Sequence, residues 1–175
     1  MINRITVGVV DAGAAGAMAD GLADVLVDCV EGGASVSFMS PMDKQDALEF
    51  WRGVAAGVAR GERVLLVARD QAERIAGTVQ VVVGQPPNQP HRADVSKLLV
   101  HRDYRRQGVG RQLMEAVDQI AAEAGKTLLV LDTETGSDAE RLYERAGWQR
   151  AGVIPDFALK PHGGLCATTF FYKHV

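Results

Sequence analysis

The chain has 175 residues, of which 47% are hydrophobic and 23% charged, a composition typical of a soluble globular protein. Its net charge of −3 argues against a general nucleic-acid binder, which needs a broad basic surface. The length suits one domain, expected over residues 1–175. No unbroken apolar run long enough for a secretory signal or a membrane span occurs, which predicts a cytoplasmic protein without a membrane partner. Cys29 and Cys166 are predicted to be packed, reduced thiols.

Hydrophobic periodicity predicts the elements of the first half of the chain. They are a strand at 5–10, a helix at 15–30, a helix from Ser40 to about 60, and strands at 63–69 and 75–83. Ser40 and Pro41 are a good helix start, with a serine cap and a proline at the first helical position. The two strands are expected to form an antiparallel hairpin, and the Pro-rich segment 84–90 is a loop.

The second half alternates strands and helices. We expect a strand at 93–100, a helix at about 107–124, a strand at 128–131, a helix at 138–146, a strand at 148–154, a loop at 155–164 and a strand at 167–173. The segment 128–131 is almost entirely apolar, as in a central strand covered on both faces.

A glycine turn, Arg105-x-x-Gly108-x-Gly110, joins a predicted strand to an amphipathic helix. Glycines permit close approach of the backbone to a ligand, and a helix start presents free N–H groups and a positive dipole end. With Arg106 and Arg111 nearby, the turn predicts a pyrophosphate site. An ordinary turn with solvated arginines is the alternative. The string of a P-loop does not occur, and only two of the three glycines of a dinucleotide fingerprint are present.

A second motif follows one helix and one strand later, Ala139-Glu140-Arg141-Leu142-Tyr143 continuing to Gly147-Trp148. Together with Leu98-Leu99-Val100, the glycine turn and the order of elements, it resembles the GNAT superfamily of acetyl-CoA-dependent N-acetyltransferases. Trp148 stands where that family's signature has Phe. Further strings, Gly32 to Met39, Arg92 to Leu98, Gly110 to Met114 and Leu131 to Ser137, are similar to the tabtoxin-resistance acetyltransferases, which acetylate an amino-acid-like β-lactam toxin.

The resemblance implies an α/β (α+β) fold: a mixed, mostly antiparallel sheet of six to seven strands, flanked by about four helices and splayed at the cofactor site. It also implies acetyl-CoA as cosubstrate and no metal. Strand residues would pair with the pantetheine amides, and the Val100 N–H would polarise the thioester. The implied cofactor-binding residues are Leu98, Leu99, Val100, Arg105, Arg106, Gln107, Gly108, Val109, Gly110 and Arg111.

Direct acetyl transfer needs a general acid and a base. Tyr143 is the candidate acid for the leaving thiolate, because the tyrosine of this motif in the family points at the cofactor sulfur; the alternative is a packed helix tyrosine. Asp94 is the candidate base, because counting back from Arg105 places it where many members of the family that the chain resembles carry a Glu on this strand. Asp132, at the end of the next strand, is a second candidate; the resemblance to the tabtoxin-resistance acetyltransferases implies that it is a partner for the amine, and it could instead cap the following turn.

The resemblance also places Glu31, Ser35 and Phe38 on the acceptor side. A small-molecule amine or amino-acid-like substrate is the favoured acceptor. A protein or peptide N-acetyltransferase is the alternative, and an acetyl-CoA-binding protein without catalysis is a third possibility that Tyr143 argues against. Relatives are often homodimers, although the sequence itself fixes no oligomeric state.

Overall fold

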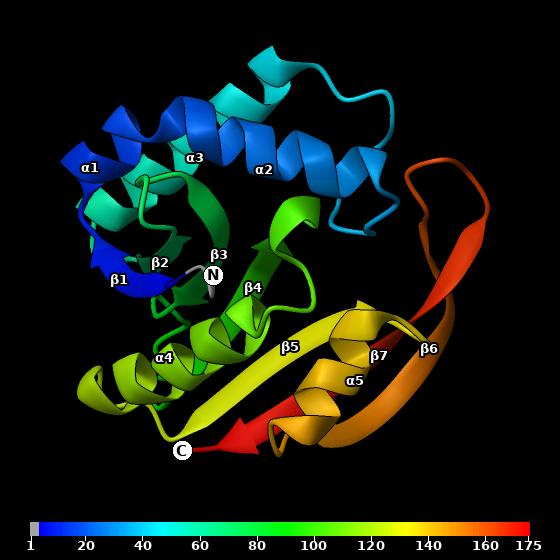
Figure 1. Ribbon diagram of the computed structural model, residues 1–175. Helices are drawn as coiled ribbons and strands as arrows, with labels where there is room; N and C mark the ends of the chain where they lie inside the picture. Colours follow the sequence, from blue (N-terminus) through cyan, green and yellow to red (C-terminus); the bar gives the residue numbers. More distant parts are fainter. Residues whose placement is uncertain (1–3) are drawn as a thin grey trace.

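A seven-stranded sheet, with strand order β1-β2-β3-β4-β5-β7-β6, organises the computed structural model, which describes residues 4–175 (Figure 1). Neighbouring strands are antiparallel except for β4 and β5, which are parallel. Five α-helices and one short 3₁₀ turn accompany the sheet within this range. The predicted mixed, mostly antiparallel fold is therefore confirmed, with one helix more than expected.

The elements follow in chain order. They are β1 (Thr6–Val10), α1 (Ala12–Ala17), α2 (Ala19–Glu31), α3 (Lys44–Ala59), β2 (Arg63–Arg69), β3 (Ile75–Val82), β4 (Arg92–Val100), the 3₁₀ turn η1 (Arg102–Tyr104), α4 (Val109–Glu123), β5 (Leu128–Glu134), α5 (Asp138–Arg145), β6 (Gln149–Leu159) and β7 (Leu165–His174).

Each face of the sheet carries its own layer of helices and its own core. Helices α1, α2 and α3 cover one face, where Trp51 of α3 is 1% exposed and packs among apolar residues of α2 and β2. Helix α4 and Tyr143 of α5 pack on the other face around the fully buried Phe171 of β7. Both predicted free thiols, Cys29 and Cys166, are confirmed as unpaired and buried.

The predicted helix at 15–30 is two helices. Met18 ends α1 and precedes α2, with backbone dihedrals of φ −91° and ψ 2°. Asp11 caps α1 by accepting a hydrogen bond from the Ala14 N–H at 2.8 Å, so the helical region begins three residues earlier than the periodicity indicated. The glycines at 13 and 16 explain the weak periodic signal, because glycine is a poor helix former without an apolar side chain.

The predicted helix start at Ser40 and Pro41 is wrong, because α3 begins at Lys44. Asp43 is its cap and accepts a hydrogen bond from the Gln45 N–H at 2.7 Å. Ser40 instead donates to the Glu31 carboxylate at 2.8 Å, and the Ser40–Pro41 peptide is cis. Because the Ser40 hydroxyl is bound to Glu31, it does not cap the helix.

The first half of the predicted loop at 155–164 is strand. β6 and β7 form a long hairpin that extends beyond the rest of the sheet, and only 160–164 form its turn (Figure 1). Pro155 misled the prediction, since proline disfavours a regular ladder. Here it falls where the register shifts between Ile154 and Ala158, a bulge that leaves the intervening residues unpaired.

A buried carboxylate connects the β2–β3 hairpin to the segment that precedes the glycine turn. Asp70 is 4% exposed and accepts hydrogen bonds from the Tyr104 hydroxyl at 2.7 Å and from the Ala72 and Arg74 N–H groups at 2.9 Å. The bond from Tyr104 leads the interactions that lower the pKa of Asp70 from 3.8 to about 2. Asp70 therefore holds Tyr104, and with it η1, against the sheet.

This depressed pKa gives a prediction for stability against pH. A carboxyl group whose folded pKa lies below its unfolded value stabilises the fold above pH 3.8, and the contribution is lost as pH falls through about 2. Asp70→Asn should therefore lower the thermal midpoint at neutral pH, and the difference from wild type should shrink between pH 4 and pH 2. Circular dichroism melts across this range test it, with exposed Glu49→Gln as control. A constant difference would contradict the assignment.

Candidate active site

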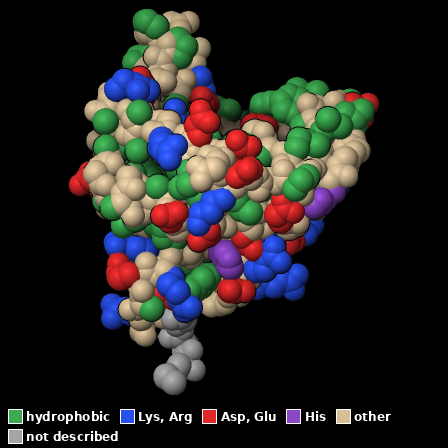
Figure 2. All heavy atoms as spheres, turned by 90° about the horizontal axis from the view of Figure 1, so that it is seen from above, with side chains coloured by type: hydrophobic (Ala, Val, Ile, Leu, Met, Phe, Trp, Pro, Cys, Tyr) green, Lys and Arg blue, Asp and Glu red, His purple; other side chains and the backbone are tan. Residues whose placement is uncertain are grey.

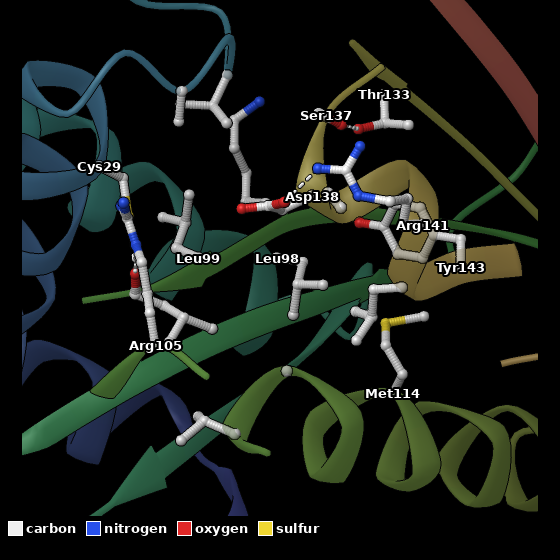
Figure 3. A pocket seen from close by; sticks show the side chains of 18 of the residues that line it. Cys29, Leu98, Leu99, Arg105, Met114, Thr133, Ser137, Asp138, Arg141 and Tyr143 are labelled. Atoms are coloured by element: carbon white, nitrogen blue, oxygen red, sulfur yellow. Dashed lines mark hydrogen bonds and ion pairs between the residues drawn. The ribbon is translucent and has the colours of Figure 1, made fainter. Parts of the chain in front are cut away.

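Strands β4 and β5 part after a short paired stretch, and the gap between them is the floor of a large cavity. Arg92, Ala93 and Asp94 pair with Leu128, Leu129 and Val130, and no further pairs between the two strands follow in the described chain. Beyond this point a cavity of about 1170 Å³ is lined by β4, the glycine turn, α4, β5, α5 and the segment after α2 (Figure 3). The predicted splay is present.

The free edge of β4 offers backbone groups to this cavity. Val100 O accepts hydrogen bonds from Cys29 Sγ at 3.5 Å and from Arg105 Nε at 3.1 Å, and thus points away from β3. The next residue, His101, donates its N–H to Ala76 O on β3. Because the N–H and C=O of one strand residue point to the same side, the Val100 N–H faces the open edge. This geometry suits a ligand amide or a thioester oxygen.

The glycine turn has the conformation of an anion site. Arg106 and Gly108 both adopt left-handed backbone conformations, with φ of 59° and 81°. Helix α4 begins immediately after Gly108, and no side chain caps it, so its first N–H groups are directed toward the cavity. Turns of this kind form concave arrays of N–H donors that bind phosphate oxygens. Arg105 and Arg111 also line the cavity, so the residues fit the pyrophosphate of acetyl-CoA.

Tyr143 lies on α5, which is held by a Ser137 cap that accepts a hydrogen bond from the Glu140 N–H. Its side chain is 6% exposed and packs against Trp148 and Phe171, yet it lines the cavity, and Figure 3 shows its hydroxyl end turned toward that space. Burial, with a smaller contribution from the Asp132 carboxylate, raises the pKa of Tyr143. The phenol is therefore protonated throughout the neutral range.

Asp132 lies on β5, across the splay from β4, and lines the same cavity. Its carboxylate lies 3.2 Å from the Thr168 hydroxyl of β7, which donates at the shorter distance of 2.9 Å to Thr133 O. Its negative charge acts to raise the pKa of both Tyr143 and Lys97, in each case as a smaller contribution than burial.

Asp94 is placed differently from the prediction. It belongs to the stretch of β4 that is still paired with β5, and it is not among the described residues that line the cavity. Arg92 and the Gln85 amide hold its carboxylate, the latter at 3.0 Å. The count back from the glycine turn found the right strand but not the point at which the strands separate.

Of the three residues predicted on the acceptor side, one lines the cavity and two lie outside it. Ser35 lines the cavity, 3.8 Å from Cys166 Sγ. Glu31 does not: its carboxylate accepts from the Met42 N–H at 2.9 Å and from Ser40, and these bonds lower its pKa. Phe38 packs edge-on against Phe50, with ring centroids 5.3 Å apart. Glu31 and Phe38 thus shape the loop 32–43 from outside the cavity.

Among the predicted cofactor residues, all but Gln107 line the cavity; the Gln107 amide donates to Asp103 O at 2.7 Å. Sequence reasoning missed Lys97, which also lines it. The signal was present in the sequence: polar Ser96 and Lys97 precede three consecutive apolar residues and interrupt the alternation of β4. A broken alternation inside a strand indicates a bulge.

Two features are absent from residues 4–175. No cluster of three or more His, Cys, Asp or Glu side chains could hold a metal ion. No helix is sufficiently long and apolar to cross a membrane.

Comparison with known proteins identifies the family. Residues 61–150 match the sequence model of the acetyltransferase (GNAT) domain. The fold is similar to that of a GCN5-related N-acetyltransferase from Kribbella flavida, with a TM-score of 0.80, 18% identity and 98% of each chain covered. It is also similar to yncA from Salmonella typhimurium, solved with its cofactor acetyl-CoA, with a TM-score of 0.79, 19% identity and coverage of 98% of this chain and 94% of that one.

A ribosomal-protein-alanine N-acetyltransferase from Brucella melitensis is similar as well, with a TM-score of 0.79, 19% identity and coverage of 97% and 99%. The matched segment extends from just before β2 to the beginning of β6, and so includes the splayed strands, the glycine turn and α5. The chain belongs to the GNAT family of acetyltransferases and is an acetyl-CoA-dependent N-acetyltransferase.

The left-handed turn provides a direct test of the cofactor site. Gly108→Val should weaken acetyl-CoA binding at least tenfold, about 1.4 kcal/mol, because a β-branched residue resists positive φ and displaces the N–H donors. Gly61→Val is the matched control: Gly61 has φ 69° and open space around it, as Gly108 does, but follows α3 outside the cavity. Calorimetry on both folded variants measures the effect. Equal affinities would show that the turn does not bind the cofactor.

Proposed function

We propose that this enzyme transfers the acetyl group of acetyl-CoA directly to a small amine or amino-acid-like acceptor, within a ternary complex. One observation carries the proposal: Tyr143 and Asp132 share a single cavity with the free edge of β4 and the glycine turn. The strings shared with the tabtoxin-resistance acetyltransferases support an acceptor such as a β-lactam toxin or antibiotic.

The residues divide the reaction between them. Acetyl-CoA supplies the thioester. The N–H groups of the glycine turn and the edge of β4, from Leu98 to Val100, bind and orient it. Asp132 holds the acceptor ammonium and takes its proton. Tyr143 returns a proton to the leaving thiolate.

The raised pKa of Tyr143 constrains this assignment. A phenol that is weaker than usual as an acid gives up its proton only as negative charge grows on the sulfur, so position must supply most of the effect. The burial that raises the pKa also removes competing water, which strengthens a hydrogen bond to a developing anion.

A protein or peptide acceptor is the alternative. The contacts between the loop 32–43 and the β6–β7 turn, beside the proposed acceptor site, argue against it. Two contacts connect the β6–β7 turn to this region: the Ser40 N–H of the loop 32–43 donates to Pro161 O at 3.0 Å, and His162 Nε2 lies 3.0 Å from Glu31 O at the end of α2. Gly33 to Ser37 of the same loop line the cavity. Because these two segments are in contact, the cavity leaves less room for an extended peptide than an open groove would.

The setting of the enzyme is part of the proposal. We place it as one catalytic domain in the cytoplasm, where the free thiols of Cys29 and Cys166 persist.

A homodimer would cover the β6–β7 hairpin, whose apolar side chains gather on the lobe at the right of Figure 2. Those more than 40% exposed there are Val153, Ile154, Phe157, Leu159 and Leu165.

Removing one hydroxyl tests the acid. Tyr143→Phe should lower kcat by roughly 10²-fold with little change in acetyl-CoA affinity, since general acids contribute about 10²–10⁴. Tyr172→Phe is the matched control, because its hydroxyl bonds Gln149 outside the cavity. Steady-state rates with chemistry shown to be rate-limiting give the answer. Wild-type turnover by Tyr143→Phe would mean that water protonates the thiolate.

The two carboxylates predicted from the sequence can be separated by their pH profiles. Asp132→Asn should lower kcat/KM most at low pH and recover partly at high pH, where the amine is already deprotonated. Asp94→Asn should leave the shape of the profile unchanged, because its carboxylate is held by Arg92 and Gln85 outside the cavity. The larger effect at Asp94 would reverse our assignment and restore the prediction made from the sequence.

A further inference from the structure

Lys97 has an unusual place in the strand that carries it. β3 and β4 are in register at Gln80 with Ser96 and again at Thr78 with Leu99, so β4 contains one residue more than β3 between these pairs. Lys97 lies in this bulge with φ 53°. A left-handed conformation is unfavourable for a residue with a side chain, so it persists only where the surroundings impose it.

The bulge turns the half-buried Lys97 side chain into the cavity. Its ammonium donates to Ser37 Oγ at 3.0 Å, and Ser37 is itself a left-handed residue, with φ 79°, on the loop after α2. Among the described residues, no carboxylate lies within ion-pair distance of Lys97 Nζ. A single neutral hydroxyl thus partners a cation that burial partly strips of water.

Asp132 is its counterpart of opposite charge. Five acidic side chains line the cavity, and four of them have a basic partner. The pairs are Glu115 with Arg111, Asp118 with Lys173, Glu134 with Lys160 and Asp138 with Arg141. In the described part of the chain, Asp132 has only the Thr168 hydroxyl. It is close enough to raise the pKa of Lys97 against the larger lowering by burial, yet the two form no ion pair.

We propose that Lys97 binds an anionic group of the acceptor, so that the enzyme selects amines that also carry a carboxylate. This rests on the proposed function, in which Asp132 holds the acceptor ammonium. An α-amino acid presents both charges a few bonds apart and can satisfy both side chains at once. An acceptor without the carboxylate leaves Lys97 desolvated and without a counter-ion, which costs binding free energy.

Paired acceptors test the proposal. The probes are α-amino acids and the α-amides with the same side chains, which keep the amine and lose the negative charge. In wild type, kcat/KM should favour the acid at least tenfold, about 1.4 kcal/mol. Lys97→Met should abolish this preference. It should raise KM for the acid, and it should lower KM for the amide, whose binding then no longer desolvates an unpaired cation.

Three further variants separate charge recognition from a structural role. Lys97→Arg keeps the cation and should restore much of the preference. Ser37→Ala removes the hydroxyl partner but not the charge. The preference should therefore survive in this variant, whereas it would be lost if Lys97 acted only by holding the loop through Ser37. Lys44→Met, an exposed lysine paired with Asp24 on the surface, is the matched control. Melting curves report whether each variant is folded.

Binding distinguishes failure of this proposal from failure of the proposed function. Calorimetry measures the affinity of each acid and amide for the CoA-bound protein without turnover. A preference for the acid that Lys97→Met removes would support the inference even if no amine were acetylated. Equal affinity of the wild type for acid and amide, or an unchanged preference in Lys97→Met, would overturn it.

Discussion

The parting of β4 and β5 is the constraint on which the site depends. Their parallel pairing ends at Asp94 and Val130, while β5 continues to pair with β7 as far as Glu134. β4 is therefore left with an unpaired edge in the middle of the sheet. An exposed edge invites association with another chain, and proteins usually cover it. Here helices α4 and α5 flank the gap, so the edge is open only to a ligand that enters the cavity and takes the place of a strand.

Backbone strain concentrates around the same gap. Of the non-glycine residues with positive φ, Ser37, Lys97 and Arg106 all line the cavity. The others have local reasons: Glu73 lies in the turn of the β2–β3 hairpin, and Asp156 lies in the bulge of β6. Unfavourable backbone conformations lower stability, and they cluster at functional sites where they set the direction of a side chain. At Lys97 the result is that a residue of a central strand points into the cavity.

The sequence predicted the two halves of the site unequally, for a physical reason. The proposed cofactor half is local: a glycine turn between a strand and a helix is recognisable from a short segment, and Gly108 and its neighbours, apart from Gln107, line the cavity. The acceptor half is tertiary. Whether Asp94 faces a cavity depends on where β4 separates from β5, and the position of Glu31 depends on Ser40 and Met42 across a loop. Spacing along one strand contains neither fact. Lys97 could have been noticed only through the broken alternation that marks the bulge.

The separation of Lys97 from Asp132 has an energetic meaning. If the two side chains met, they would neutralise each other, and the cavity would offer neither charge to a ligand. Among the residues that the structure describes, each group has only a hydroxyl within hydrogen-bond distance, Ser37 for the ammonium and Thr168 for the carboxylate, so its charge stays available to a ligand. Lys97 is half-buried whereas Asp132 is exposed, and a partly buried cation without a counter-ion lowers the stability of the free enzyme. A ligand that supplies both counter-ions recovers that free energy on binding. A ligand with only one charge does not, and the enzyme therefore discriminates between the two.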